Sequence, residues 1–153
     1  MTRLEPGQLW VIRIHAAIAG LALLLLGAAA ETVLRERFGI PRGAVLLPLL
    51  LPLAWIVFIA PGRRYRAWGY VFAPEELSVR RGIWTELLTL VPLERVQHID
   101  ISQGPVERAF GVCRLVLHTA GTLHSRIVLP GLSRETAERM RDEIRARISA
   151  EAA

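Results

Sequence analysis

Residues 43–60 read GAVLLPLLLPLAWIVFIA and contain no charged side chain. As an α-helix this stretch would be about 27 Å long, which is close to the hydrocarbon thickness of a bilayer. A second apolar stretch, residues 16–30, precedes it. It reaches a full span if residues 9–14 join it and Arg13 extends to the headgroups. The sequence therefore predicts a membrane-anchored chain with a two-helix transmembrane hairpin.

The composition leaves room for one further domain. The chain has 153 residues, of which 52% are hydrophobic, a share more typical of membrane proteins than of soluble ones. We predict a transmembrane helical hairpin over residues 1–62 and a soluble domain over residues 63–153, long enough for one modest core. The single cysteine, Cys113, excludes an internal disulfide and agrees with a reducing cytoplasm.

Arginine placement predicts the orientation in the membrane. The net charge is +5, with no lysine. Five arginines flank the outer ends of the two spans and three lie in the loop between them: Arg3, Arg13, Arg63, Arg64 and Arg66 against Arg35, Arg37 and Arg42. The positive-inside bias puts both termini, and the soluble domain, in the cytoplasm of a multi-pass protein of the cell (inner) membrane.

The same charges predict a phospholipid partner. Arg63, Arg64 and Arg66 directly follow the second span, and we expect them among anionic headgroups, each contributing about 1 kcal/mol. The sequence shows no dense basic face, so it predicts no nucleic-acid partner.

A cleaved signal peptide is the competing interpretation of the first span. Arg3 and Arg13 precede the apolar run, and residues 28–30 are three alanines, as at a signal-peptidase site. The long polar start with Glu5, Pro6 and Trp10 favours a retained helix. The soluble domain is cytoplasmic under either interpretation.

From residue 65 the hydrophobic period changes to two. Leu77 and Val79, for example, alternate with Ser78 and Arg80, which is typical of half-buried strands. The pattern predicts strands near residues 65–72, 77–81, 83–91, 96–102, 112–119 and 122–129. Short antiparallel strands in this order predict a meander that curls into a barrel or sandwich.

The carboxyl end is predicted to be a helix that covers one open end of the barrel. Ser133 is a candidate N-cap. Ala137, Met140, Ile144 and Ile148 share one stripe at helical spacing, which is typical of a core contact.

A series of short motifs resembles a known family. They are Val91-Pro92-Leu93, Arg95-Val96-Gln97, Gln103-Gly104-Pro105, Glu107-Arg108, Phe110-Gly111 and Thr119-Ala120-Gly121. Their order and spacing, with the preceding residues 77–82 and the helical hairpin, resemble the bacterial pleckstrin-homology-like domain family of the YdbS type. The resemblance implies a membrane-anchored α+β fold, in which a PH-like split β-barrel is closed by a C-terminal α-helix at the inner membrane face. It implies no enzymatic activity, and some members are associated with envelope stress or resistance to membrane-active peptides.

The motif residues have structural roles that need no ligand. Pro92 is expected to end a strand, Phe110 to plug the barrel, and Gly111 to permit a tight bend. Gln97 and Gln103 are expected to bond backbone groups around Glu107. Mainly structural roles are predicted for Pro92, Arg95, Gln97, Gln103, Gly104, Pro105, Phe110, Gly111 and Gly121.

The sequence contains no recognisable catalytic or metal-binding motif. His15, His98, His118 and His124 have no metal-ligand spacing, and one cysteine makes no thiolate cluster. No nucleophile elbow or phosphate loop is present. His98 and His118 are expected as neighbours on an outer strand face, as ordinary surface residues rather than a pH switch. We therefore predict no enzyme, no cofactor and no metal site.

Two functions are compatible with such a chain. The first is a non-enzymatic PH-like module that mediates protein–protein association, with another protein or an identical copy, at the cytoplasmic membrane face. The alternative is a lipid- or peptide-responsive component of an envelope-stress, antimicrobial-peptide-resistance or transport system.

Overall fold

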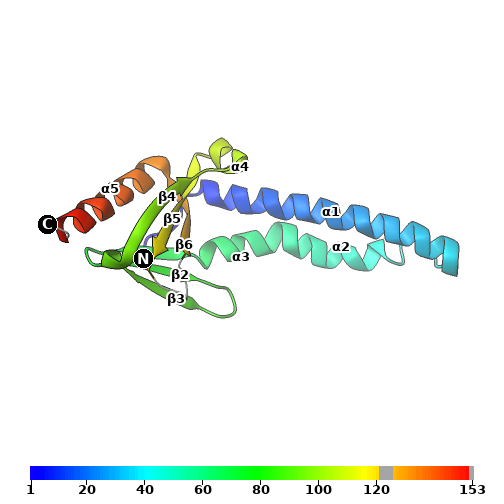
Figure 1. The fold of residues 1–153 in the computed structure, drawn as a ribbon. Coiled ribbons are helices and arrows are strands. Elements are labelled where there is room, and N and C mark those ends of the chain that lie inside the picture. The colour runs from blue at the N-terminus through cyan, green and yellow to red at the C-terminus, as the bar shows by residue number, and fades with distance from the viewer. Residues whose placement is uncertain (121–125, 152–153) are drawn as a thin grey trace. The chain divides into compact units, whose positions relative to one another are not determined.

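The structure is a computed structural model that describes residues 1–120 and 126–151. The chain forms two compact units (Figure 1). The helical unit is Ile12–Arg63, and the sheet unit is Met1–Val11 together with Arg64–Ala153. The predicted domains, 1–62 and 63–153, remain a prediction.

Two long helices confirm the helical hairpin. The first, α1, is Gly7–Phe38, and the second consists of α2 (Leu46–Ala54), η1 (Trp55–Ile59) and α3 (Ala60–Arg66). Both are long and apolar enough to cross a membrane. The η1 segment is π-helical and begins three residues after Pro52, which removes a backbone donor from the helix.

Small and polar residues of α1 position the second helix within the helical unit. A Cβ atom at Gly27 would lie only 2.9 Å from the Leu49 side chain, so glycine permits the close approach of the helices. The Glu31 carboxylate accepts hydrogen bonds from the amides of Gly43 (2.6 Å) and Leu46 (3.1 Å). Glu31 therefore satisfies donors at the start of α2 that the helix itself leaves unpaired.

The first sheet is an antiparallel meander, β1 (Gly69–Phe72), β2 (Glu76–Arg81) and β3 (Leu87–Pro92), in that order. The predicted strand 83–91 is wrong in its first four residues, since residues 82–86 connect β2 to β3. Gly82 has φ of 121°, which breaks the strand where the apolar pattern continues.

The second sheet holds β4 (Val96–Ser102), β5 (Val112–Thr119) and β6 (Arg126–Ser133), also antiparallel and in chain order. The 3₁₀ helix η2 (Leu93–Arg95) leads into β4, and the short helix α4 (Pro105–Ala109) joins β4 to β5. The strands predicted over residues 96–102 and 112–119 are confirmed. Residues 122–125 of the last predicted strand lie outside the described residues.

The core of the sheet unit combines both sheets and the helix α5 (Arg134–Glu151). The Ser133 hydroxyl accepts a hydrogen bond from the Thr136 amide at 3.1 Å, which confirms the N-cap. The predicted stripe is also confirmed: Ala137, Met140 and Ile144 are buried and Ile148 packs against the core. The strands form two three-stranded sheets, and closure into one barrel is not seen in the described residues.

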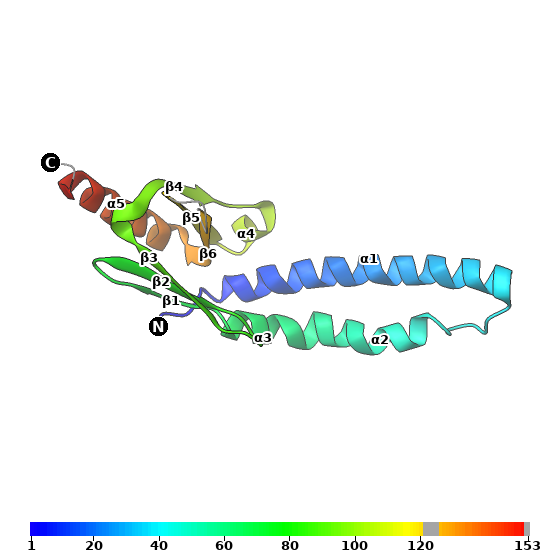
Figure 2. The same cartoon turned by 60° about the horizontal axis from the view of Figure 1, so that its bottom comes forward.

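The amino-terminal segment packs on the sheets of the same unit. Leu4 is part of the buried core, and Thr2 forms an isolated bridge with Tyr70 of β1. The Glu5 amide donates to the Gly131 carbonyl at 2.8 Å, and the Tyr65 hydroxyl donates to the Leu4 carbonyl at 2.6 Å. Figure 2 shows the N-terminus beside β1. This docking was not predicted from the sequence.

Candidate lipid-contact and docking surfaces

The three arginines predicted to contact lipid lie on α3. Arg63, Arg64 and Arg66 are all exposed. The guanidinium of Arg63 lies 5.9 Å from the centroid of the Trp55 ring, a cation–π geometry that joins a basic and an aromatic side chain on one helix. Their contact with headgroups stays a prediction.

An apolar hairpin tip lies between β2 and β3. We define the tip as residues 82–87, from the glycine that ends β2 to the first residue of β3. Trp84 is 90% exposed, and Ile83 and Leu87 are each 41% exposed. Arg80 and Glu86 form an ion pair at 3.2 Å, while Arg81 is exposed beside them. The tip therefore combines large apolar side chains with a basic flank.

The outward face of the first sheet carries exposed leucines of β3 beside polar residues of β2. Register places Val71 of β1 opposite Ser78 of β2, and Ser78 opposite Leu90 of β3. Leu88 shares this face because strand side chains alternate. Leu88 and Leu90 are 52% and 54% exposed. The opposite face of the same sheet carries core residues, so large apolar side chains lie on both of its faces.

The family motif is built around a buried carboxylate. The Glu107 side chain is only 4% exposed. It accepts hydrogen bonds from the Gly104 amide at 2.7 Å and from Arg114 Nε at 2.5 Å. Pro105 occupies the first turn of α4, where its missing donor costs nothing. This part of the motif is thus a structural connection between β4 and β5, and no helix was predicted here from the sequence.

Two of the smaller predictions in this region are confirmed and one is wrong. Gln103 Nε2 donates to the Val112 carbonyl at 2.9 Å, and Gly111 has φ of 65°, as a tight bend requires. Phe110 does not plug the barrel: it is half-buried and stacks on Trp10, with ring centroids 6.3 Å apart. Phe110 directly follows α4 and is not part of either sheet. Its ring therefore contacts Trp10 near the start of α1.

The remaining motif residues lie at different positions in the sheets and their connections. Pro92 is the last residue of β3, as predicted. Gln97 is exposed at a shift of register between β4 and β5. The Arg95 carbonyl accepts a hydrogen bond from the Ala120 amide at 3.0 Å. Gly121 lies outside the described residues.

His98 and His118 are neighbours, as predicted, on adjacent strands. Their ring centroids lie 5.8 Å apart, and the Asp100 carboxylate lies 2.9 Å from His98 Nε2 and 3.4 Å from His118 Nε2. All three side chains are substantially exposed. Among the described residues no group of His, Cys, Asp and Glu is arranged to hold a metal ion.

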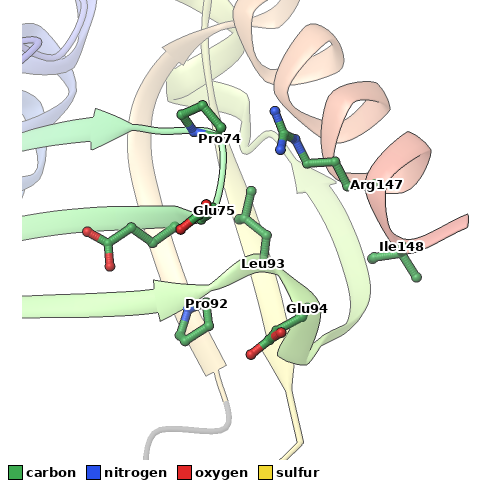
Figure 3. Close-up of a pocket in the computed structure, with 8 residues that line it drawn as sticks. Pro74, Glu75, Pro92, Leu93, Glu94, Arg147 and Ile148 are labelled. Carbon is green, nitrogen blue, oxygen red and sulfur yellow. The ribbon is translucent and has the colours of Figure 1, made fainter. Parts of the chain in front are cut away.

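A shallow pocket of about 440 Å³ opens between the β1–β2 turn, η2 and α5 (Figure 3). It is lined by Pro74, Glu75, Glu76, Pro92, Leu93, Glu94, Arg147 and Ile148. Three of the lining residues are glutamates and one is an arginine, and none of the eight is a histidine, serine or cysteine. The charged residues of the pocket are therefore mainly acidic.

The sequence of the chain is similar to that of a known protein family. A family model described as "Bacterial PH domain" matches residues 14–148. The chain belongs to the bacterial PH domain family. This PH-family chain is 34% identical to the UPF0699 transmembrane protein YdbS of Bacillus subtilis (strain 168), over 93% of the chain and 89% of that relative.

A second relative of the PH-family chain is the UPF0699 transmembrane protein YdbT of Bacillus subtilis (strain 168). It is 27% identical over 67% of the chain, which corresponds to only 20% of that longer protein. No solved structure matches the chain significantly. The chain is thus a YdbS-like transmembrane protein with a bacterial PH domain, and neither the family nor the relatives indicate an enzymatic function.

Proposed function

We propose that this chain is a non-enzymatic, membrane-anchored PH-like module that mediates protein–protein association, with a second copy of itself as the partner. The observation that supports this function is the open apolar edge of the first sheet. β3 is the last strand of its sheet, and no strand among the described residues pairs with its second edge.

An edge strand with exposed leucines is a template for strand pairing. β3 presents Leu88 and Leu90 outward, and the strand itself carries no lysine, arginine, aspartate or glutamate that would oppose pairing. Two copies of β3 related by a two-fold axis would pair antiparallel, since such an interface uses the same surface on both partners. The pairing would extend a three-stranded sheet to a six-stranded one and join the two apolar outer faces.

Anchoring would favour this association. The two spans would confine every copy to one membrane, which raises the effective concentration of partners. Five arginines flanking the outer span ends against three in the loop support a cytoplasmic position for the sheet unit. The shared core of the two sheets and α5 supports a split barrel covered by that helix.

Oxidative crosslinking in membranes tests the association. Leu88→Cys and Leu90→Cys place thiols on the outward face of β3, and residues that pair across an antiparallel interface have the Cα separation that a disulfide needs. We expect copper phenanthroline to give a disulfide-linked dimer with at least one of the two variants. Leu90→Glu should convert the dimer of the otherwise wild-type chain to monomer on blue-native electrophoresis.

Matched controls are available in the same unit. Ala146→Cys places an exposed thiol on α5, outside β3, and Ala146→Glu places a charge there. Neither should give a crosslink or change the oligomeric state. The wild-type Cys113 is buried and should not crosslink. A wild-type chain that is monomeric after mild solubilisation and gives no β3 crosslink in membranes would overturn the proposal.

A further inference from the structure

We infer that the β2–β3 hairpin tip, residues 82–87, is a second lipid contact that inserts its apolar side chains into the interface of the membrane holding the two spans. This goes beyond self-association, because it concerns a different surface and a different partner. It is carried by the exposure of the tip, its charge and its place along the sheet.

Strand register places the tip at the end of the sheet where the chain leaves the second span. The chain leaves α3 at Arg66 and enters β1 at Gly69, a path of at most about 11 Å. Gly69 pairs with Arg80, and Arg81 pairs with Leu87. The tip therefore begins at the level of Gly69, while the β1–β2 turn, residues 73–75, lies at the other end of the sheet.

The chain path from the end of the second span to the tip is short, which favours lipid as the partner of the tip. Trp84 is four residues beyond Arg80, so it extends at most about 14 Å from the level of Gly69. Arg66, three residues before Gly69, is at the end of an apolar span and is expected among headgroups. The length of this path thus permits contact between the tip and the membrane surface in every copy of the chain, whereas a protein partner would have to be recruited.

The chemistry of the tip fits an interface. Trp84 has a large apolar ring with one N–H donor, the side chain most enriched at membrane–water interfaces. Ile83 and Leu87 flank it, both 41% exposed. Insertion would remove these apolar surfaces from water, where their exposure is unfavourable.

The charges of the tip fit an anionic surface. Glu86 is the one acidic residue of the tip, and its carboxylate is paired with Arg80 at 3.2 Å. Arg81 then leaves a net positive charge beside the apolar side chains. Arginine side chains are attracted to an anionic leaflet, so the electrostatic contribution adds to that of apolar burial.

Depth-dependent quenching tests the insertion on the full chain. Trp84→Cys and Ile83→Cys, the second of which keeps Trp84, are labelled with an environment-sensitive fluorophore and reconstituted into anionic liposomes. Glu75→Cys, exposed in the β1–β2 turn at the other end of the sheet, is the matched control. The wild-type chain is the labelling blank, because Cys113 is buried.

We expect the labels at positions 83 and 84 to lose most of their fluorescence when lipids carry a nitroxide near the headgroup. The label at position 75 should keep most of its fluorescence. Equal quenching at both ends of the sheet would overturn the inference. A blue-shifted label at position 84 that nitroxide lipids do not quench, and whose shift grows with protein density, would also overturn it by assigning the tip to a second copy.

Discussion

At the scale of single residues, we expect Glu107 to contribute to the stability of the fold. Its buried carboxylate satisfies the Gly104 amide and the Arg114 guanidinium at once. Glu107→Ala leaves that amide without an acceptor and the arginine without its partner, so we expect the free energy of unfolding to fall by about 1–3 kcal/mol. Glu107→Gln keeps an acceptor oxygen and should lose less. Thermal unfolding of the solubilised chain, followed by near-ultraviolet circular dichroism, measures both.

The control for Glu107 is a surface ion pair on α5. Arg134 and Glu138 lie 2.9 Å apart, with side chains 68% and 41% exposed. Exposed pairs of this spacing contribute about 0.3–0.5 kcal/mol, so Glu138→Ala should change stability little. Equal losses for Glu107→Ala and Glu138→Ala would show that burial of the Glu107 carboxylate has no energetic consequence.

We expect Tyr70 to make the stability of the fold depend on pH. Burial, and then the carboxylate of Glu5, raise the pKa of Tyr70 above its ordinary value of 10.0. The folded state therefore holds the phenolic proton more tightly than the unfolded state does. The resulting stability is fully present below pH 10 and is lost as the pH rises through the raised pKa.

We expect the free energy of unfolding of the wild-type chain to decline above pH 10, and that of Tyr70→Phe to decline less. Urea unfolding at several pH values on both sides of 10 measures the difference between the two curves. Burial also raises the pKa of the Cys113 thiol, which both proteins share, so that contribution cancels in the comparison. Parallel curves above pH 10 would contradict the assignment to Tyr70.

At the scale of elements, the contact between the start of α1 and the end of α4 depends on a glycine. A Cβ atom at Gly7 would collide with the Phe110 carbonyl oxygen and lie 2.9 Å from a methyl group of Val112. Gly7→Ala should therefore lower the midpoint of thermal unfolding by displacing the amino-terminal segment. The same substitution at Gly62 of α3 is the control, since a Cβ there meets no atom within 4 Å.

Because of helix propensity, the two glycine substitutions should shift the midpoint of thermal unfolding in different directions. Alanine is favoured over glycine in a helix by about 1 kcal/mol, so Gly62→Ala should leave the midpoint unchanged or raise it. A fall of similar size for both variants would contradict a specific close approach at Gly7.

The elements that could be predicted from sequence are those with local signals. Residues 43–60 and the stripe of Ala137, Met140 and Ile144 repeat one chemical pattern over many residues, and β4 and β5 alternate clearly. The helix α4 was missed because Gly104 and Pro105 are also turn residues, and only the Glu107 carboxylate makes them a helix start. Ile83 and Trp84 have high strand propensity, yet they belong to a tip because Gly82 ends β2 first.

The candidate surfaces were less predictable than the elements. The proximity of His98 and His118 followed from strand order, but the exposure of Leu88 and Leu90 depends on which face of β3 meets the core. Alternation alone gives two equivalent faces, and both faces of β3 carry leucine or valine. The contact of Phe110 with Trp10 joins distant parts of the sequence, for which no local pattern exists.

At the scale of the whole molecule, the packing of the first residues bears on processing. Leu4 is 3% exposed in the core of the sheet unit, and its carbonyl accepts the Tyr65 hydroxyl. Cleavage at residues 28–30 would remove Leu4 and open that core. We therefore expect the mass of the chain isolated from membranes to include residues 1–30. A mass that lacks the residues before position 31 would contradict this expectation.

The bond between the Glu5 amide and the Gly131 carbonyl has a consequence for biosynthesis. A ribosome makes Glu5 before the two apolar helices and Gly131 after them. The Glu5 amide must therefore wait until β6 emerges, whereas Thr2 can pair with Tyr70 as soon as β1 has been made. The sheet unit is therefore completed only after both apolar helices have been made, and a nascent chain arrested before Gly131 lacks the acceptor for the Glu5 amide.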